Sequence, residues 1–126
     1  MAKISPQTTG EHLEMEGFEG HYGPVGDFTV GFETYDRDED PSPLFKGLPD
    51  DACQARHWGV VLEGTLVFRY SDGSEDVIEA GEAYYAPPGH LPVFKAGTKV
   101  VEFSPTDELG ATMAVVEANI NAMRAG

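Results

Sequence analysis

Short stretches that favour β-strands follow one another from residue 57 to residue 103, at the spacing of about ten residues that all-β domains show. A glycine stands at each junction, and glycine suits tight turns because it tolerates positive φ angles. Such a pattern is typical of a sandwich or barrel of β-strands. The candidate strands are 57–62, 65–70, 75–79, 82–86, 91–95 and 98–103, and the junction glycines are Gly64, Gly73, Gly81, Gly89 and Gly97.

The segments before this region are less regular. Residues 27–35 alternate between apolar and polar positions, which predicts a half-buried strand. Residues 1–26 are rich in Gly and Glu, so we expect them to be mostly irregular, with one short edge strand around 12–15. His21 in this segment is either a surface residue or a lid over a pocket. Residues 36–52 hold three prolines and six acids and predict a long loop, solvated rather than calcium-binding because the calcium-loop spacing is absent.

The end of the chain changes to a helical period. Ser104 is a candidate cap, Pro105 fits the first helical position, and acids follow in the first turn. Apolar residues then recur at steps of four and three, which predicts an amphipathic helix over about 105–124 that covers the barrel or a second subunit. This stripe is Leu109, Met113, Val116, Ile120 and Met123. We therefore expect one domain over 1–126, with its core barrel at about 27–103.

Charge and composition exclude several classes of function. The formal net charge is -14, from 8 basic and 22 acidic residues, and so few cations cannot neutralise a run of nucleic-acid phosphates. No apolar run approaches the roughly 20 residues of a membrane helix, and the first residues lack the apolar core of a signal peptide. The single cysteine excludes an intrachain disulfide and fits a reducing cytoplasm.

Two motifs in the central region resemble those of the cupin family. Gly81, Pro87 and Gly89 have the spacing of the second cupin motif, and the stretch from His57 to Gly64 is similar to the end of the first. The resemblance covers about 51–103. It implies an all-β jelly-roll β-barrel, here followed by the C-terminal α-helix. Many cupins hold a metal inside the barrel with histidines and an acid or amide from these motifs.

The resemblance breaks down at the usual metal ligands. The two histidine positions of the first motif fall on Asp51 and Cys53, and its Glu or Gln position falls on His57. The histidine position of the second motif falls on Pro92, while His90 stands two residues earlier. The usual set of three histidines is therefore absent as written.

Strand parity gives an independent argument for a site around His57. Alternate residues of a strand share a face, and the odd positions from 53 to 61 are small or chemically active, so we assign them to the interior with room for a ligand beside His57. His90 follows a glycine at the mouth of a strand, where it should face the same cavity. With Cys53, the two histidines form a candidate site for zinc, iron or manganese. Its affinity should weaken as the pH falls through about 6.5.

Simpler interpretations remain open for the same residues. Cys53 alone is more often a buried inert residue, His57 alone can be a hydrogen-bonded core histidine, and the pocket can be polar without a metal. Glu102 lies in a strand between apolar residues, so it either faces solvent or needs a partner. We include it among the ligand-binding candidates.

Two functional hypotheses follow. In the first, the barrel binds a small molecule, with His57 and His90 as polar anchors and with walls from Tyr84, Tyr85 and Phe94. In the second, the protein is a metal-dependent enzyme of the dioxygenase, isomerase or decarboxylase kind found among cupins. Cupins commonly pair through barrel faces, so in either case we expect a homodimer.

Overall fold

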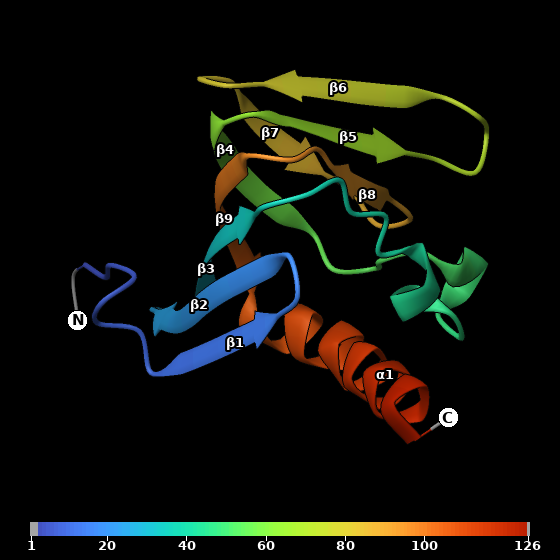
Figure 1. Cartoon of the computed structure of the whole chain (residues 1–126), viewed down its shortest axis with the longest axis horizontal. Helices are drawn as coiled ribbons and strands as arrows, with labels where there is room; N and C mark the ends of the chain where they lie inside the picture. Colours follow the sequence, from blue (N-terminus) through green and yellow to red (C-terminus); the bar gives the residue numbers. More distant parts are fainter. Residues whose placement is uncertain (1–2, 126) are drawn as a thin grey trace.

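The computed structural model describes residues 3–125, which form two antiparallel sheets and one C-terminal helix (Figure 1). The larger sheet has the strand order β1-β2-β3-β9-β4-β7 and the smaller one the order β6-β5-β8. The strands of the larger sheet are β1 (Glu11–Met15), β2 (Phe18–Val25), β3 (Phe28–Tyr35), β4 (His57–Glu63), β7 (Ala83–Ala86) and β9 (Thr98–Pro105). Those of the smaller sheet are β5 (Thr65–Arg69), β6 (Glu75–Glu79) and β8 (Leu91–Phe94).

The main hydrophobic core draws side chains from both sheets. Leu66 and Phe68 of the smaller sheet are at most 1% exposed, as is Val61 of the larger one. Tyr35 of β3 stacks on Phe94 of β8, with ring centroids 3.8 Å apart. Every strand from β3 to β9 contributes to this core, so the interior faces of the two sheets are packed against each other.

The expectation that residues 1–26 are mostly irregular is wrong for the part after residue 10. β1 pairs with β2, and β2 pairs along its whole length with β3, in the register Phe18↔Tyr35 to Val25↔Phe28. The larger sheet therefore begins at Glu11, well before residue 27. Glycines and acids obscure the apolar period of these strands, because one of their faces is charged and the other leaves space for a tyrosine.

The helix α1 (Thr106–Ala125) begins after β9 has run through Pro105, so Ser104 and Pro105 end a strand instead of capping the helix. The guanidinium of Arg56 and the carboxylate of Glu108 form an ion pair that joins the first turn of α1 to the segment before β4. Of the apolar stripe on α1, Val116 is buried, and Met113 and Ile120 pack beside it.

The predicted loop at 36–52 contains two short 3-10 helices, η1 (Ser42–Phe45) and η2 (Pro49–Asp51). It packs against α1 through a second apolar cluster that includes Phe45 and Val116. The side-chain amide of Asn119 donates hydrogen bonds to the carbonyl oxygens of Leu44 and Lys46, at 2.7 and 2.9 Å. The helix thus covers this loop of its own chain. Within residues 3–125, no helix is long and apolar enough to cross a membrane.

Candidate metal centre

The parity prediction for the segment leading into β4 is confirmed. The odd positions from 53 to 61 are all buried, while Trp58 on the opposite face is 37% exposed. Alternation along an extended chain requires only that one face meets the core, and here that face includes the sole cysteine and His57. The inward set is Cys53, Ala55, His57, Gly59 and Val61.

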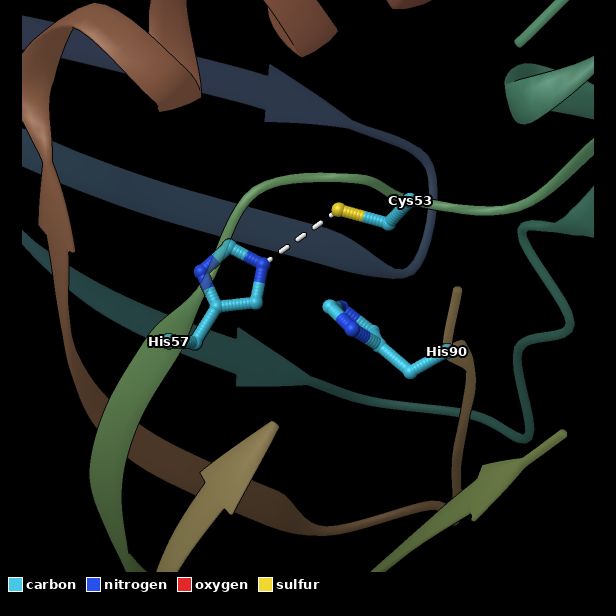
Figure 2. A group of neighbouring side chains, drawn as sticks. All are labelled: Cys53, His57 and His90. Carbon is cyan, nitrogen blue, oxygen red and sulfur yellow. Dashed lines mark hydrogen bonds between the residues drawn. The ribbon is translucent and has the colours of Figure 1, made fainter. Parts of the chain in front are cut away.

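Cys53, His57 and His90 lie together, although His90 belongs to a different part of the chain (Figure 2). The Cys53 sulfur is 3.4 Å from Nε2 of His57, and the two imidazole centroids are 4.9 Å apart. One ligand atom from each residue lies within 4.8 Å of the others. A backbone bridge pairs Cys53 with His90, with Cys53 N donating to His90 O at 3.0 Å. This bridge sets the separation of the two residues.

His90 presents a buried nitrogen that has no partner. Its Nδ1 lies 2.6 Å from the carbonyl oxygen of Pro87, and because a carbonyl only accepts, Nδ1 must carry the proton. Nε2 therefore carries a lone pair, yet it is fully buried and makes no hydrogen bond to any residue in the described range 3–125. A buried acceptor without a partner costs about 1–3 kcal/mol, so the fold retains it at a penalty.

His57 has a similar arrangement. Its Nδ1 lies 2.6 Å from the hydroxyl oxygen of Ser104 and 3.7 Å from a carboxylate oxygen of Glu102. The Cys53 sulfur lies on the side of Nε2, and its thiol can donate to that nitrogen or to the carbonyl oxygen of Ala55, 3.9 Å away. A histidine whose second nitrogen is held by a hydrogen bond in this way has the orientation typical of metal ligands.

Burial keeps all three groups uncharged near neutral pH. It lowers the pKa of His57 to about 4, and burial together with the neighbouring His57 lowers the pKa of His90 to about 4. Burial raises the pKa of the Cys53 thiol to about 12. The contact between His57 and Glu102 is therefore not an ion pair at pH 7. It is a contact between a neutral imidazole and a carboxyl group that desolvation makes harder to ionise.

A second layer of polar groups lies behind His57. The hydroxyl of Tyr84 donates to Glu102 at 2.8 Å, and the hydroxyl of Tyr22 donates to Glu33. Burial raises the pKa of Glu102 to about 7; burial and the charge of Glu102 raise the pKa of Glu33 to about 8. Glu102 thus has the partner that its sequence position requires. The sequence analysis missed Glu33 and Tyr22. The only available signal was an acid on the polar face of residues 27–35.

Two details of the predicted pocket are wrong. Tyr85 lies on the outer face, 46% exposed, with its ring 5.1 Å from that of Trp58. Its neighbour Tyr84 takes the inward position. The space left by Gly59 is also occupied, because a Cβ there would meet the Tyr84 hydroxyl and the Val101 carbonyl oxygen at 2.6 Å. Gly59 therefore makes room for a tyrosine of the protein rather than for a ligand.

The candidate centre is closed to solvent. Cys53, His57 and His90 are 3%, 6% and 0% exposed. Cys53 belongs to the apolar cluster beneath the 36–52 loop and α1, whereas Phe94 lies in the main core against Tyr35. An incoming molecule would have to displace this loop to reach the sulfur and the two nitrogens.

Comparisons with known proteins identify the fold. No family model and no curated protein matches the sequence. Among solved structures, an RmlC-like cupin from Shewanella frigidimarina matches with a TM-score of 0.54 at 20% identity, over 81% of this chain and 88% of that one. A protein of unknown function from Rhizobium leguminosarum matches with a TM-score of 0.56 at 19% identity, over 82% and 95% of the two chains.

An enzyme is also among the matching structures. Hydroxypropylphosphonic acid epoxidase from S. wedmorenis matches with a TM-score of 0.55 at 15% identity, over 80% of this chain and 57% of that one. This chain therefore spans little more than half of that enzyme. A structure described as Fe(II)-HppE with an alternative substrate matches with a TM-score of 0.54 at 14% identity, over 80% of this chain and 58% of that one. These structural matches establish a shared fold. The functional residues must be judged on this chain alone.

Proposed function

Because the chain has the cupin fold, we propose that it binds a small molecule at a divalent metal held by Cys53, His57 and His90, inside a jelly-roll β-barrel formed by its two sheets. The observation that carries this proposal is the lone pair on His90 Nε2, which is fully buried and unpaired. A metal ion would satisfy that nitrogen, and the fold already holds a second nitrogen and a sulfur beside it.

The donor set favours zinc. One thiolate and two imidazole nitrogens are ligands of borderline softness, and zinc sites with three protein ligands keep an open fourth position. Iron and manganese remain alternatives from the sequence, and a matching structure with this fold is an Fe(II) form. The thiolate makes manganese the poorest fit of the three. When bound, the metal would supply a Lewis-acid position that anchors an oxygen or nitrogen of the small molecule.

The protein residues around this centre orient the ligands and exclude water. The Pro87 carbonyl holds Nδ1 of His90 and so keeps its Nε2 unprotonated, while Ser104 holds Nδ1 of His57 and leaves its Nε2 directed toward Cys53. The low pKa values of the two histidines keep them neutral, as metal binding requires. The loop at 36–52 covers the centre until the small molecule enters. We also place the protein in the reducing cytoplasm, where the Cys53 thiol stays available.

A metal-dependent enzyme is the second candidate, and one observation favours it. The carboxyl of Glu102 lies 3.7 Å from His57 and has a pKa of about 7 because of burial. A carboxyl poised near the working pH can take up or release a proton. Because Glu102 lies on the Nδ1 side of His57, behind the metal centre, it would act on a bound molecule through that imidazole, held in place by the Tyr84 hydroxyl.

Cobalt substitution tests the metal centre directly. Cys53 is the only cysteine, so a thiolate-to-cobalt charge-transfer band in the near ultraviolet can arise from this position alone. We expect tag-free protein to develop the band with one equivalent of Co²⁺, and His57→Ala to lose it while remaining folded. The exposed-face variant His21→Ala is the matched control and should keep the band. A parent protein that shows no band under reducing conditions would refute the metal centre.

The open coordination position needs its own probe. Imidazole added to the cobalt-loaded protein should change the visible d–d absorption, because it would occupy the position left by the three protein ligands. An unchanged spectrum at saturating imidazole would mean that the metal, if bound, is closed to small molecules.

A further inference from the structure

A second group of histidines lies on the outer face of the β1–β2 hairpin. His12 of β1 is directly opposite His21 of β2, and two pairs further along Glu14 is opposite Glu19. Because side chains alternate along a strand, these four residues share one face. That face is opposite the one from which Tyr22 reaches Glu33. The group therefore has no part in the site between the sheets.

The three residues His12, Glu19 and His21 converge at their polar atoms. The imidazole rings are stacked, with centroids 4.3 Å apart and planes within 5°. Glu19 reaches both rings, with one carboxylate oxygen 3.5 Å from His12 Nε2 and the other 3.4 Å from His21 Nε2. The ligand atoms of the three residues all lie within 4.8 Å of one another.

We propose that His12, Glu19 and His21 form a surface site for a borderline divalent cation, zinc foremost. Two imidazole nitrogens and a carboxylate are a zinc ligand set, and Glu14, with an oxygen 4.0 Å from His12 Nε2, stands close enough to supply a fourth ligand. Hard cations such as magnesium prefer sites built from oxygen ligands alone, so the two histidines provide the selectivity.

The site differs from the interior centre in its access. The side chains of His12 and Glu19 are each 48% exposed and that of His21 is 25% exposed, so an ion can reach them without any movement of the fold. A bound ion would join β1, the edge strand of the larger sheet, to β2 through side chains. The function of the site would therefore be to fix this edge strand.

Chemical modification separates this site from the interior one. The protein has four histidines, and His57 and His90 are buried, so diethylpyrocarbonate should modify His12 and His21 first in the folded protein. We expect micromolar Zn²⁺ to protect both residues, as measured by peptide mass spectrometry. Mg²⁺ at the same concentration should not protect them.

The Glu19→Gln variant keeps both histidines but removes the carboxylate that joins them. We expect the zinc concentration needed for protection to rise at least about tenfold, since even residues that only support a metal ligand contribute that much. Glu63→Gln is the matched control, because it removes one exposed carboxylate from a different part of the larger sheet. Equal protection by Mg²⁺, or undiminished protection in Glu19→Gln, would overturn the proposal.

Discussion

The Nδ1 atom of His90 lies 2.6 Å from the carbonyl oxygen of Pro87, and this contact determines which nitrogen of the ring can bind a metal. The ring proton must lie between Nδ1 and this oxygen, so the buried Nε2 keeps its lone pair, and no donor within residues 3–125 faces it. The turn between β7 and β8 thus does more than reverse the chain, because the carbonyl of Pro87 selects the tautomer of His90, three positions later.

Cobalt binding at the interior centre should strengthen with pH. The Cys53 thiol has a pKa of about 12, so it must release one proton to bind the metal, and affinity should rise about tenfold per pH unit between pH 5 and 8. Protons compete with the metal for the histidine nitrogens only near pH 4, because burial lowers the pKa values of both histidines. This pH is lower than the value of 6.5 expected from the sequence. The charge-transfer band, titrated at several pH values, measures the slope. A pH-independent affinity would exclude Cys53 as a ligand.

The free energy of unfolding of the metal-free protein should depend on Glu33. Its folded pKa is about 8, above the ordinary value of 4.5, so between these pH values the folded state holds a proton that the unfolded state has lost. This contribution is fully present below pH 4.5 and is lost as the pH rises through 8. In Glu33→Gln, the free energy of unfolding should therefore fall less steeply as the pH rises. Above pH 7 it should exceed that of the parent by about 1 kcal/mol or more.

Thermal unfolding with a chelator present, at pH 5, 7 and 8.5, tests this dependence. Glu117→Gln is the control, because Glu117 is an exposed acid on α1. If Glu33→Gln and Glu117→Gln change the melting temperature equally at each pH, the buried carboxyl is not the source of the dependence.

Two glycines should respond in opposite ways to the same added methyl group. Gly59→Ala would place a Cβ 2.6 Å from the Tyr84 hydroxyl and a backbone oxygen, and overpacking of this kind costs about 1–3 kcal/mol. Gly110→Ala in α1 meets no atom within 4 Å and should stabilise the helix by up to about 1 kcal/mol. Urea unfolding of the two variants beside the parent gives both values. A neutral Gly59→Ala would mean that Tyr84 is not held against Glu102.

The packing of the 36–52 loop over Cys53 should weaken when Asn119 is replaced. Asn119→Ala removes two hydrogen bonds to the backbone of the 36–52 loop, and each such bond is worth about 1 kcal/mol. We expect Cys53, which is 3% exposed, to react up to about thirtyfold faster with a thiol reagent in this variant. Asn121→Ala, at an exposed position on the same helix, should leave the rate unchanged. Equal rates in both variants would show that the thiol is reached by another route.

The homodimer stays a prediction. We now expect its interface on the outer face of the larger sheet and not on the helix stripe. The middle of the helix stripe, at Met113, Val116 and Ile120, packs beneath the loop at 36–52. The outer face of the larger sheet exposes an aromatic cluster in which Trp58 lies between Phe28 and Tyr85. In a chain of net charge -14, an aromatic face whose central ring carries the Arg56 guanidinium, itself paired with Glu108, is where a second copy can approach most easily. Sedimentation should give a dimer for the parent and a monomer for Tyr85→Asp. Val77→Asp, at an exposed apolar position of the smaller sheet, is the control.

Strand parity explains why part of the site could be predicted. Alternation depends on the local chain alone, so the burial of Cys53, His57 and Val61 followed from one stretch of sequence. Parity also separates Tyr84 from Tyr85, but it does not say which of the two faces inward. That choice depends on the pairing of β7 with β4, where Tyr84 is opposite Gly59.

The layer of polar groups behind His57 could not be predicted, because its contacts depend on the register between strands that are distant in the sequence. Glu33 meets the Tyr22 hydroxyl only because β2 and β3 pair without a shift, and Glu102 meets Tyr84 only because both strands flank β4. No local pattern encodes these meetings. The approach of His90 to His57 was expected from the motif resemblance, whereas the backbone bridge from His90 to Cys53 was not.

The backbone bridge between Cys53 and His90 has a consequence for local unfolding of the protein. His57 begins a strand of the larger sheet, and His90 directly precedes β8 of the smaller one, with Cys53 joined to it through the main chain. An ion shared by the three would be a removable cross-link between the sheets. Amide hydrogen exchange in β4 and β8 would then slow together when the ion binds and quicken together when a chelator removes it.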